Sequence, residues 1–397
     1  MRKSLVLSIL ALSFAAWGAS AQTLSEVLRS VESRNATLQS AQWSKLADEQ
    51  DLKGQAQPAN PEVEFNYLWG SVDARRHDFK VTQSFDLALL SGRRAKEAAS
   101  GKELLAIEYR AQRQEILLEA EKVCIDIVFN NALREALGEH LTDAEHFVAA
   151  YARKVELGDA SVLELNNARL HRSEVSGKLA KAELEHSRLT LDLARLNGGE
   201  AIEVTETEID AFLAGFDRPL PESFAEYFEQ ASEQSPALAY VKEQIELRDR
   251  QLKVEKSSRL PELTLGYMSE ITTEDPYRGI TVGVSIPLWS QSSKVRKAKA
   301  NLEAAKSQKE EAYQACWHQL ASQYADAEGL REMSLAYRSG LEEADSREYL
   351  KKAQEQGEIS VIDYISEIDL FYENLEETLD AECSYRQAVA ELNAIFL

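Results

Sequence analysis

The chain contains the same succession of sequence patterns twice, offset by about 200 residues. The segment LSEVLRSVESRNATL, which begins at Leu24, aligns with FAEYFEQASEQSPAL, which begins at Phe224. Further along, ELGDASVLEL from Glu156 aligns with EQGEISVIDY from Glu355, and each half closes on a Leu-Asn pair. A duplicated unit of this length far exceeds the repeat of a solenoid, so we expect one fold built from two equivalent halves.

Each half contains two short runs in which apolar and polar residues alternate. These runs lie at about 62–70 and 78–87 in the first half and at about 262–269 and 279–288 in the second. A period of two predicts four β-strands in two hairpins, each with one apolar and one polar face. A soluble sheet with one buried face is the ordinary alternative, because the alternating signal of a membrane strand is weak in any single segment.

Long helices are expected after each hairpin. No proline lies between Pro61 and Pro219 or after Pro287, so these stretches lack the residue that most disrupts helices. Their apolar residues recur at spacings of three and four, as in coiled coils. The expected helices lie at about 36–57 before the first hairpin, at 92–156 and 160–197 after it, and at 292–355 and 359–395 after the second.

The repeat also defines the expected organisation of the chain. Residues 1–21 combine a basic start, an apolar stretch and a small-residue end, which is typical of a cleavable secretory signal peptide. No cysteine lies beside the cleavage site, so we do not expect a lipoprotein. The first repeat is expected at residues 22–200, a linker at 201–220 and the second repeat at 221–397.

Charge and hydropathy exclude several classes of protein. The formal net charge is -22, which makes nucleic acid an unsuitable partner because phosphates repel an acidic surface. After the signal there is no run of about 20 apolar residues, so we expect any membrane crossing to be made by strands.

The sequence offers little for catalysis or metal binding. It has no HExxH motif and no phosphate-binding glycine loop, so we expect no enzyme, no cofactor and no metal site. The pairs Glu139-His140 and Glu145-His146 could contact a metal ion, but short motifs of this kind often occur by chance. His186 falls on a helical stripe and is interpreted as a packing residue. The cysteines are interpreted mainly as small core residues: Cys124, Cys316 and Cys383.

Four strands raise a problem of closure. Open sheet edges would leave backbone hydrogen-bonding groups unpaired in lipid, and four strands cannot close a barrel. Several chains must therefore share one barrel. Three chains would supply 12 strands, within the even-numbered range of bacterial outer membrane barrels.

The order of these features resembles the TolC-like outer membrane factors, the exit channels of tripartite efflux pumps and type I secretion systems. The resemblance rests on LPEL at 260–263 before a strand, IPL at 286–288 before a long helix, and a Gly-x-x-Ser turn in each half followed by an acid. FDL at 85–87 and GRR at 92–94 are also similar to the heavy-metal efflux branch. The resemblance implies a mainly α-helical homotrimer, with a shared 12-stranded β-barrel in the outer membrane continued by an α-helical coiled-coil barrel in the periplasm.

The resemblance also implies partners and a role. The partners are a periplasmic adaptor protein, an inner-membrane pump of RND or ABC type and outer membrane lipid, and the chain passes substrates from the pump across the outer membrane. One alternative is a periplasmic coiled-coil adaptor or scaffold, which should carry one helical hairpin flanked by small β domains. A hydrolase is another, and it should show convergent acids, bases or nucleophiles. Two equivalent hairpins, each before a long helical pair, favour the channel.

Three groups of residues are candidates for functional roles. By the resemblance, Asp363 and its counterpart Glu164 lie at the periplasmic gate, where facing acids should have raised pKa values. The alternative is that each acid only complements the positive N-terminus of its own helix. The candidate adaptor-docking tip comprises Gly158, Ser161, Gly357 and Ser360. Aromatic residues near strand ends are expected at the boundary of lipid and water: Tyr67, Trp69, Phe85, Tyr277 and Trp289.

Overall fold

The structure is a computed structural model that describes residues 23–70, 75–86, 90–213, 219–272, 275–286 and 291–397. The expected signal peptide and Trp289 lie outside the described residues. None of the described helices combines the length and apolar character needed to cross a membrane.

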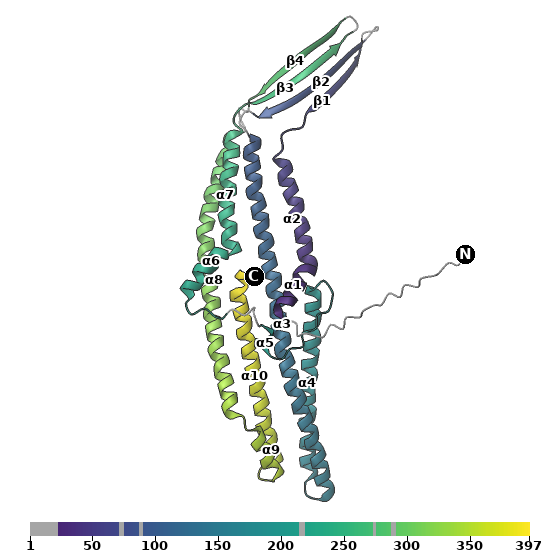
Figure 1. The fold of residues 1–397 in the computed structure, drawn as a ribbon, viewed down its shortest axis with the longest axis vertical. Helices are drawn as coiled ribbons and strands as arrows, with labels where there is room; N and C mark the ends of the chain where they lie inside the picture. Colours follow the sequence, from purple (N-terminus) through teal and green to yellow (C-terminus); the bar gives the residue numbers. More distant parts are fainter. Residues whose placement is uncertain (1–22, 71–74, 87–89, 214–218, 273–274, 287–290) are drawn as a thin grey trace, which may run out of the picture. The chain divides into compact units, whose positions relative to one another are not determined.

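The elements follow the same order in both halves of the chain (Figure 1). The first half contains α1 (Leu24–Arg34), α2 (Ala36–Gln55), β1 (Glu62–Trp69), β2 (Arg75–Asp86), α3 (Leu90–Leu157), α4 (Val162–Leu196) and the short α5 (Ile209–Phe212). The second contains α6 (Phe224–Gln234), α7 (Pro236–Ser257), β3 (Glu262–Ile271), β4 (Pro276–Ser285), α8 (Gln291–Ala344), α9 (Arg347–Glu355), α10 (Val361–Asn393) and a 3-10 turn, η1 (Ala394–Phe396). The predicted mainly helical fold with a small β part is confirmed.

The described residues form two compact units. Within the described ranges, the first unit takes residues from 23–30, 123–213 and 345–380, and the second takes residues from 31–122, 219–344 and 381–397. Each unit therefore takes segments from both sequence repeats. The duplication describes the order of the elements, whereas compact packing joins segments that are far apart in the chain.

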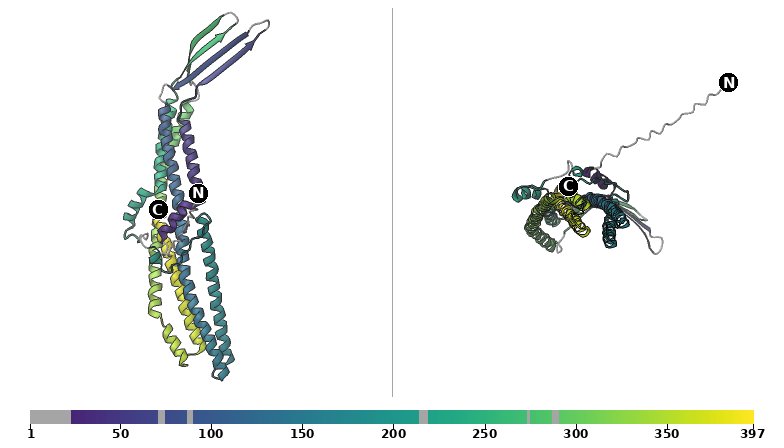
Figure 2. Two further views of the ribbon diagram at one scale, coloured as in Figure 1. Left: turned by 45° about the vertical axis from the view of Figure 1, so that its right-hand side comes forward. Right: turned by 90° about the horizontal axis from the view of Figure 1, so that it is seen from below.

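The four strands belong to the second unit and form one antiparallel sheet in the order β1-β2-β3-β4. The two hairpins are joined because β2 pairs with β3, from His77 opposite Ile271 to Asp86 opposite Glu262. Figure 2 shows the sheet in another orientation. The last strand differs from expectation: it spans Pro276–Ser285, about three residues earlier than predicted, so its middle lies at Ile280 and Thr281.

The long helix expected at 292–355 is interrupted. It ends at Ala344, and α9 begins at Arg347. The carboxylate of Asp345 accepts hydrogen bonds from the backbone nitrogen of Arg347, at 3.2 Å, and from its guanidinium group. Because an aspartate that bonds its neighbouring backbone competes with helical hydrogen bonds, it ends one helix and begins the next.

The linker expected at 201–220 is more ordered than its polar composition suggests. In the first unit it contains α5, and several of its apolar side chains are buried: Ile202, Val204, Ile209, Phe212 and Leu213. Asn131 on α3 donates hydrogen bonds to the carbonyl oxygens of Val204 and Glu206, both at 3.0 Å. The described part of the linker up to Leu213 therefore packs as part of the first unit.

In the second unit, the helices near the chain's C-terminus are fastened by side chains that bond backbone carbonyls. Tyr227 on α6 donates to the carbonyl oxygen of Leu392, and Tyr324 on α8 donates to that of Pro221 at 2.7 Å.

Arg113 on α3 pairs with both carboxylate oxygens of Glu32, at 2.6 and 2.8 Å. This bidentate pair lowers the pKa of Glu32.

Candidate functional site

The sheet has one continuous apolar face. The register places Val63, Val81, Tyr67 and Tyr267 on the same side. The full apolar set consists of Val63, Phe65, Tyr67, Trp69, Phe79, Val81, Phe85, Leu263, Leu265, Tyr267, Ile271, Ile280, Val282 and Val284. Several of these side chains are widely exposed, with 84% exposure at Ile280 and 65% at Phe65. Apolar exposure of this extent marks a surface that meets an apolar environment.

The polar members of this face lie mostly toward the ends of the strands. Arg75, His77 and Arg278 lie toward the ends that carry the hairpin loops, and Gln83 lies toward the ends that join the helices. An apolar band between two more polar margins results. Such a band is the pattern of strands that cross a bilayer.

The opposite face of the sheet is polar and charged. Arg76 on β2 lies 3.0 Å from Glu270 on β3, and Lys80 lies 3.8 Å from Glu64 on β1. Ser84 on β2 and Thr264 on β3 share a hydrogen bond of 3.1 Å. These cross-strand polar pairs suit a face in contact with water.

The predicted interface aromatics separate into two groups. Tyr67, Trp69 and Phe85 lie on the apolar face, near the ends of β1 and β2, as the interface prediction requires. Tyr277 lies opposite Glu270 on the polar face. Side chains alternate between the two faces along a strand, so Tyr277 points away from the face that carries Arg278 and Ile280. A lipid-facing role therefore does not follow for Tyr277, and it stays a prediction for the other three.

The two expected tip turns have the same backbone structure. Gly158 and Gly357 have positive φ values of 80° and 74°, a conformation that glycine adopts at little cost. After each glycine, the next amide reaches back five residues: the nitrogen of Asp159 to the oxygen of Lys154, and that of Glu358 to the oxygen of Ala353, both at 2.8 Å. These are the hydrogen bonds of a Schellman motif, which ends a helix and reverses the chain.

The serine of each turn caps the helix that follows. Ser161 Oγ accepts from the backbone nitrogen of Glu164 at 3.2 Å, and the Glu164 carboxylate accepts in return from the Ser161 nitrogen at 2.7 Å. The hydrogen bonds from Ser161 lower the pKa of Glu164. In the second repeat, Ser360 Oγ accepts from the nitrogen of Asp363 at 3.1 Å and donates to its carboxylate at 2.6 Å. Within one chain, both acids thus serve as helix caps.

A shared apolar core in the first unit holds the two turns together. Phe147 on α3 stacks on Tyr364 on α10, with ring centroids 4.9 Å apart. Gln354 on α9 donates a buried hydrogen bond of 2.9 Å to the hydroxyl of Tyr151. The candidate tip is therefore one packed structure contributed by both repeats.

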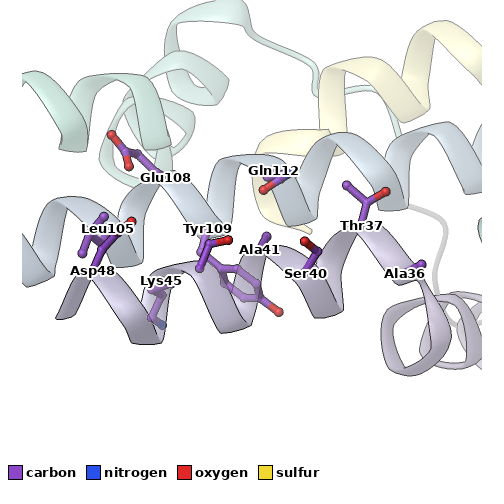
Figure 3. A pocket seen from close by; sticks show the side chains of 11 residues that line it. Ala36, Thr37, Ser40, Ala41, Lys45, Asp48, Leu105, Glu108, Tyr109 and Gln112 are labelled. Atoms are coloured by element: carbon purple, nitrogen blue, oxygen red, sulfur yellow. The ribbon is translucent and has the colours of Figure 1, made fainter. Parts of the chain in front are cut away.

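Helix α2 is only lightly covered by the rest of the second unit. Leu38 is its one buried residue, and Trp43 is 70% exposed. A groove of about 580 Å³ runs between α2 and α3 (Figure 3). Small side chains such as Ser40 and Ala41 line one side of it, and Tyr109 lines the other.

The sequence prediction missed one cluster of potential ligands. In the first unit, His140 on α3, His171 on α4 and Asp369 on α10 meet, whereas the sequence alone indicates only neighbouring pairs such as Glu139-His140. Sequence spacing holds no signal for such a site, because each ligand comes from a different helix.

Comparison with known proteins agrees with this architecture. Residues 228–396 match the family described as Outer membrane efflux protein. No curated protein matches the sequence significantly. Three solved structures are similar over most of both chains. CusC has a TM-score of 0.76 and 15% sequence identity, over 94% of this chain and 92% of that chain. The CmeC outer membrane channel of Campylobacter jejuni has a TM-score of 0.73 and 15% identity, over 100% of this chain and 94% of that chain. The open state of the MtrE outer membrane channel of Neisseria gonorrhoeae has a TM-score of 0.75 and 13% identity, over 94% of this chain and 88% of that chain.

At these identities the structural similarity establishes the fold, and the family match covers the second half of the chain, from residue 228 to residue 396. The matched segment, residues 228–396, and the shared fold agree with the expected class of outer membrane efflux channel. A family described by efflux agrees with the expectation that the chain is not an enzyme.

Proposed function

We propose that three copies of this chain form the outer membrane exit duct of a tripartite efflux pump. In this assembly the strands of the three copies close a 12-stranded barrel in the outer membrane, and the helices extend into the periplasm. A periplasmic adaptor protein and an inner-membrane pump of RND or ABC type supply the substrate and the energy.

The observation that carries this proposal is the sheet. It has an exposed apolar face, a polar face and two free edges within the chain, at β1 and β4. Free edges in lipid are costly, so strands with such a face need neighbours on both sides. A second copy whose β4 pairs with β1 provides one of them, and a ring of three closes the sheet.

The lightly covered helix α2 supports the same assembly. Its small residues, among them Ala36 and Ala41, allow close approach of another helix, and Trp43 offers a large apolar contact. In a ring of copies, a helix of the neighbouring chain covers this face and removes Trp43 from water.

The helix tips are the proposed adaptor-docking surface. In a trimer, the turns at Gly158 and Gly357 occur three times each and form a rim with uniform backbone structure. The acids Glu164 and Asp363 stand one turn inside that rim, where we place the periplasmic gate.

Outer membrane fractionation tests the proposal. The full chain, expressed with its leader in a Gram-negative host, should sediment with the outer membrane and run on semi-native gels as a trimer that heating converts to monomer. Single channels should appear in planar bilayers after purification in detergent. A monomer in the soluble periplasmic fraction contradicts the proposal.

A narrower proposal is that the channel serves the heavy-metal branch of the family. Its support is the sequence resemblance at 85–87 and 92–94. Deletion of the gene should then sensitise cells to zinc, cobalt or cadmium salts and not to a panel of lipophilic drugs, with restoration by a plasmid copy. Sensitivity to drugs alone contradicts the branch and leaves the channel in place.

A further inference from the structure

Two histidines and one aspartate lie close together inside the first unit. One potential ligand atom of each of His140, His171 and Asp369 lies within 4.8 Å of the other two. Both histidines are almost fully buried, with 2% of His140 and 4% of His171 exposed. Three side chains that commonly bind metal ions, from three helices, thus meet in the interior of the helical bundle.

The imidazole nitrogens of this cluster lack the hydrogen bonds that buried polar atoms normally make. Among the residues that the structure describes, neither Nδ1 nor Nε2 of His140 has a hydrogen-bond partner, and neither does Nδ1 of His171. Each unsatisfied buried donor or acceptor destabilises the folded state, because it has lost its hydrogen bonds to water. Three such atoms in one place indicate a missing partner that binds all of them.

The neighbouring rings do not supply that partner. His140 stacks face to face on Tyr372, with ring centroids 3.8 Å apart and planes inclined by 6°. The nitrogen lone pairs of an imidazole lie in the ring plane, so this stacking leaves them available. The stack also fixes the orientation of His140, which reduces the entropy lost when a ligand binds.

The contact between His171 and Asp369 has the spacing of two metal ligands. Nδ1 of His171 lies 3.3 Å from Oδ1 of Asp369 but does not meet the geometry of a hydrogen bond. Two ligands of a tetrahedral zinc ion, each bonded at about 2.1 Å, are about 3.4 Å apart. This pair therefore needs little movement to accept an ion.

The protonation state of His140 is compatible with metal binding. Burial, together with the nearby His171, lowers the pKa of His140 to about 4. At neutral pH the imidazole is therefore neutral and has a free lone pair to donate.

We propose that His140, His171 and Asp369 bind a divalent first-row transition metal ion, with zinc as the preferred occupant. Two imidazoles and one carboxylate form a known three-ligand set for zinc, with water as the fourth ligand. Calcium and magnesium are disfavoured because they prefer oxygen ligands. Cobalt(II) and iron(II) suit the same ligands but bind more weakly.

The ion acts as a cross-link between α3, α4 and α10. It stabilises the folded unit by mass action, because the unfolded chain holds no preformed site. The site is internal to one chain and does not depend on which substrate the channel exports.

Metal titration of the full chain tests this site. The protein is purified in detergent, stripped with a chelator and titrated with zinc by calorimetry and with cobalt by visible absorption. We expect one zinc ion per chain, with a Kd below about 1 μM, and the absorption bands of four-coordinate cobalt. Zinc should also raise the Tm of the stripped protein.

Variants identify the ligands. Asp369→Asn keeps the shape of the side chain and should weaken zinc binding by at least about 100-fold, as should His171→Gln, because loss of second-shell contacts alone costs up to that much. His186→Gln is the matched control: it also has a buried nitrogen without a hydrogen-bond partner among the described residues, but it lies outside the cluster. It should bind zinc as the wild type does.

Two results would overturn the proposal. One is a wild-type protein that binds no zinc in this range while its circular dichroism shows intact helices. The other is equal zinc affinity in wild type and Asp369→Asn, which would place the ion elsewhere, for example at the exposed His146. The second result would also appear as a zinc-dependent rise in Tm that persists in Asp369→Asn.

Discussion

Two serines at the helix tips, Ser161 and Ser360, cap the helices that follow them within one chain. Ser161 and Ser360 each accept a hydrogen bond from the third residue of the helix that follows. Replacing an N-capping serine by alanine costs about 1 kcal/mol. Ser161→Ala and Ser360→Ala should therefore speed amide hydrogen exchange in the first turns of α4 and α10 by about 5-fold, since 1 kcal/mol corresponds to that factor.

The matched control for the caps is Ser187→Ala. Ser187 is exposed in the middle of α4, where its hydroxyl donates to the carbonyl oxygen of Glu183 and caps nothing. Its replacement should leave exchange at the tips unchanged. Exchange rates that stay at the wild-type level in both cap variants would show that tertiary contacts alone hold these turns.

The gate prediction concerns the same two acids in the assembled trimer. If Glu164 and Asp363 face the pore, three copies of each concentrate negative charge at its narrow end and favour cations. Glu164→Gln combined with Asp363→Asn should then reduce cation selectivity and block by divalent ions in planar bilayers. Glu174→Gln, at an exposed position farther along α4, is the control. Unchanged conductance and selectivity in the double variant would leave only the capping role.

The tip residues could be predicted from sequence, whereas the histidine cluster could not. Gly158 and Ser161 belong to a turn of four residues whose backbone conformation depends on these residues alone. The same motif occurs in the second repeat. His140, His171 and Asp369 meet only because three helices pack in one particular register, which depends on every contact along them. The spacing of residues along the sequence does not predict how these helices pack against one another.

The sheet is the element whose two faces differ most clearly. Ile280 and Thr281 are adjacent at the middle of β4, and the register places them on the apolar and the polar face. Arginine on a lipid-facing side near the bilayer midplane costs about 2–4 kcal/mol. Ile280→Arg should therefore reduce the amount of heat-labile trimer in the outer membrane, whereas Thr281→Arg should have a mild effect. Equal losses in both variants would contradict this orientation of the strand.

Sequence patterns predict the boundaries of helices and strands less well than their existence. Alternation predicts the existence of β4 but not its limits, because the polar residues near Tyr277 and Arg278 fit either a loop or a strand end. The sequence does not predict the interruption at Asp345, for a different reason. Neither proline nor glycine marks it, and it depends on hydrogen bonds that the carboxylate makes to Arg347.

At the scale of the whole molecule, the duplication explains both the order of the elements and the number of strands. Each repeat contributes one hairpin, and β2 pairs with β3 to make a single sheet. What the sequence cannot predict is how the two repeats divide into compact units, because each unit joins segments from both. That division depends on packing between distant segments.

The central claim is that β1 of one copy pairs with β4 of the next, and paired cysteines test it most directly. Thr281→Cys on β4 is combined with Glu64→Cys, Asn66→Cys or Leu68→Cys along the same polar face of β1, in a chain with its native cysteines replaced. Within one chain β1 and β4 are separated by two strands, hence by about 14 Å. A disulfide needs Cα atoms within about 7 Å, so it can form only between copies.

The account predicts that at least one of these pairs, oxidised in outer membranes, yields a covalent trimer on denaturing gels, while each single-cysteine variant stays monomeric. No disulfide between copies at any position, from a protein that is folded and present in the outer membrane, would contradict it.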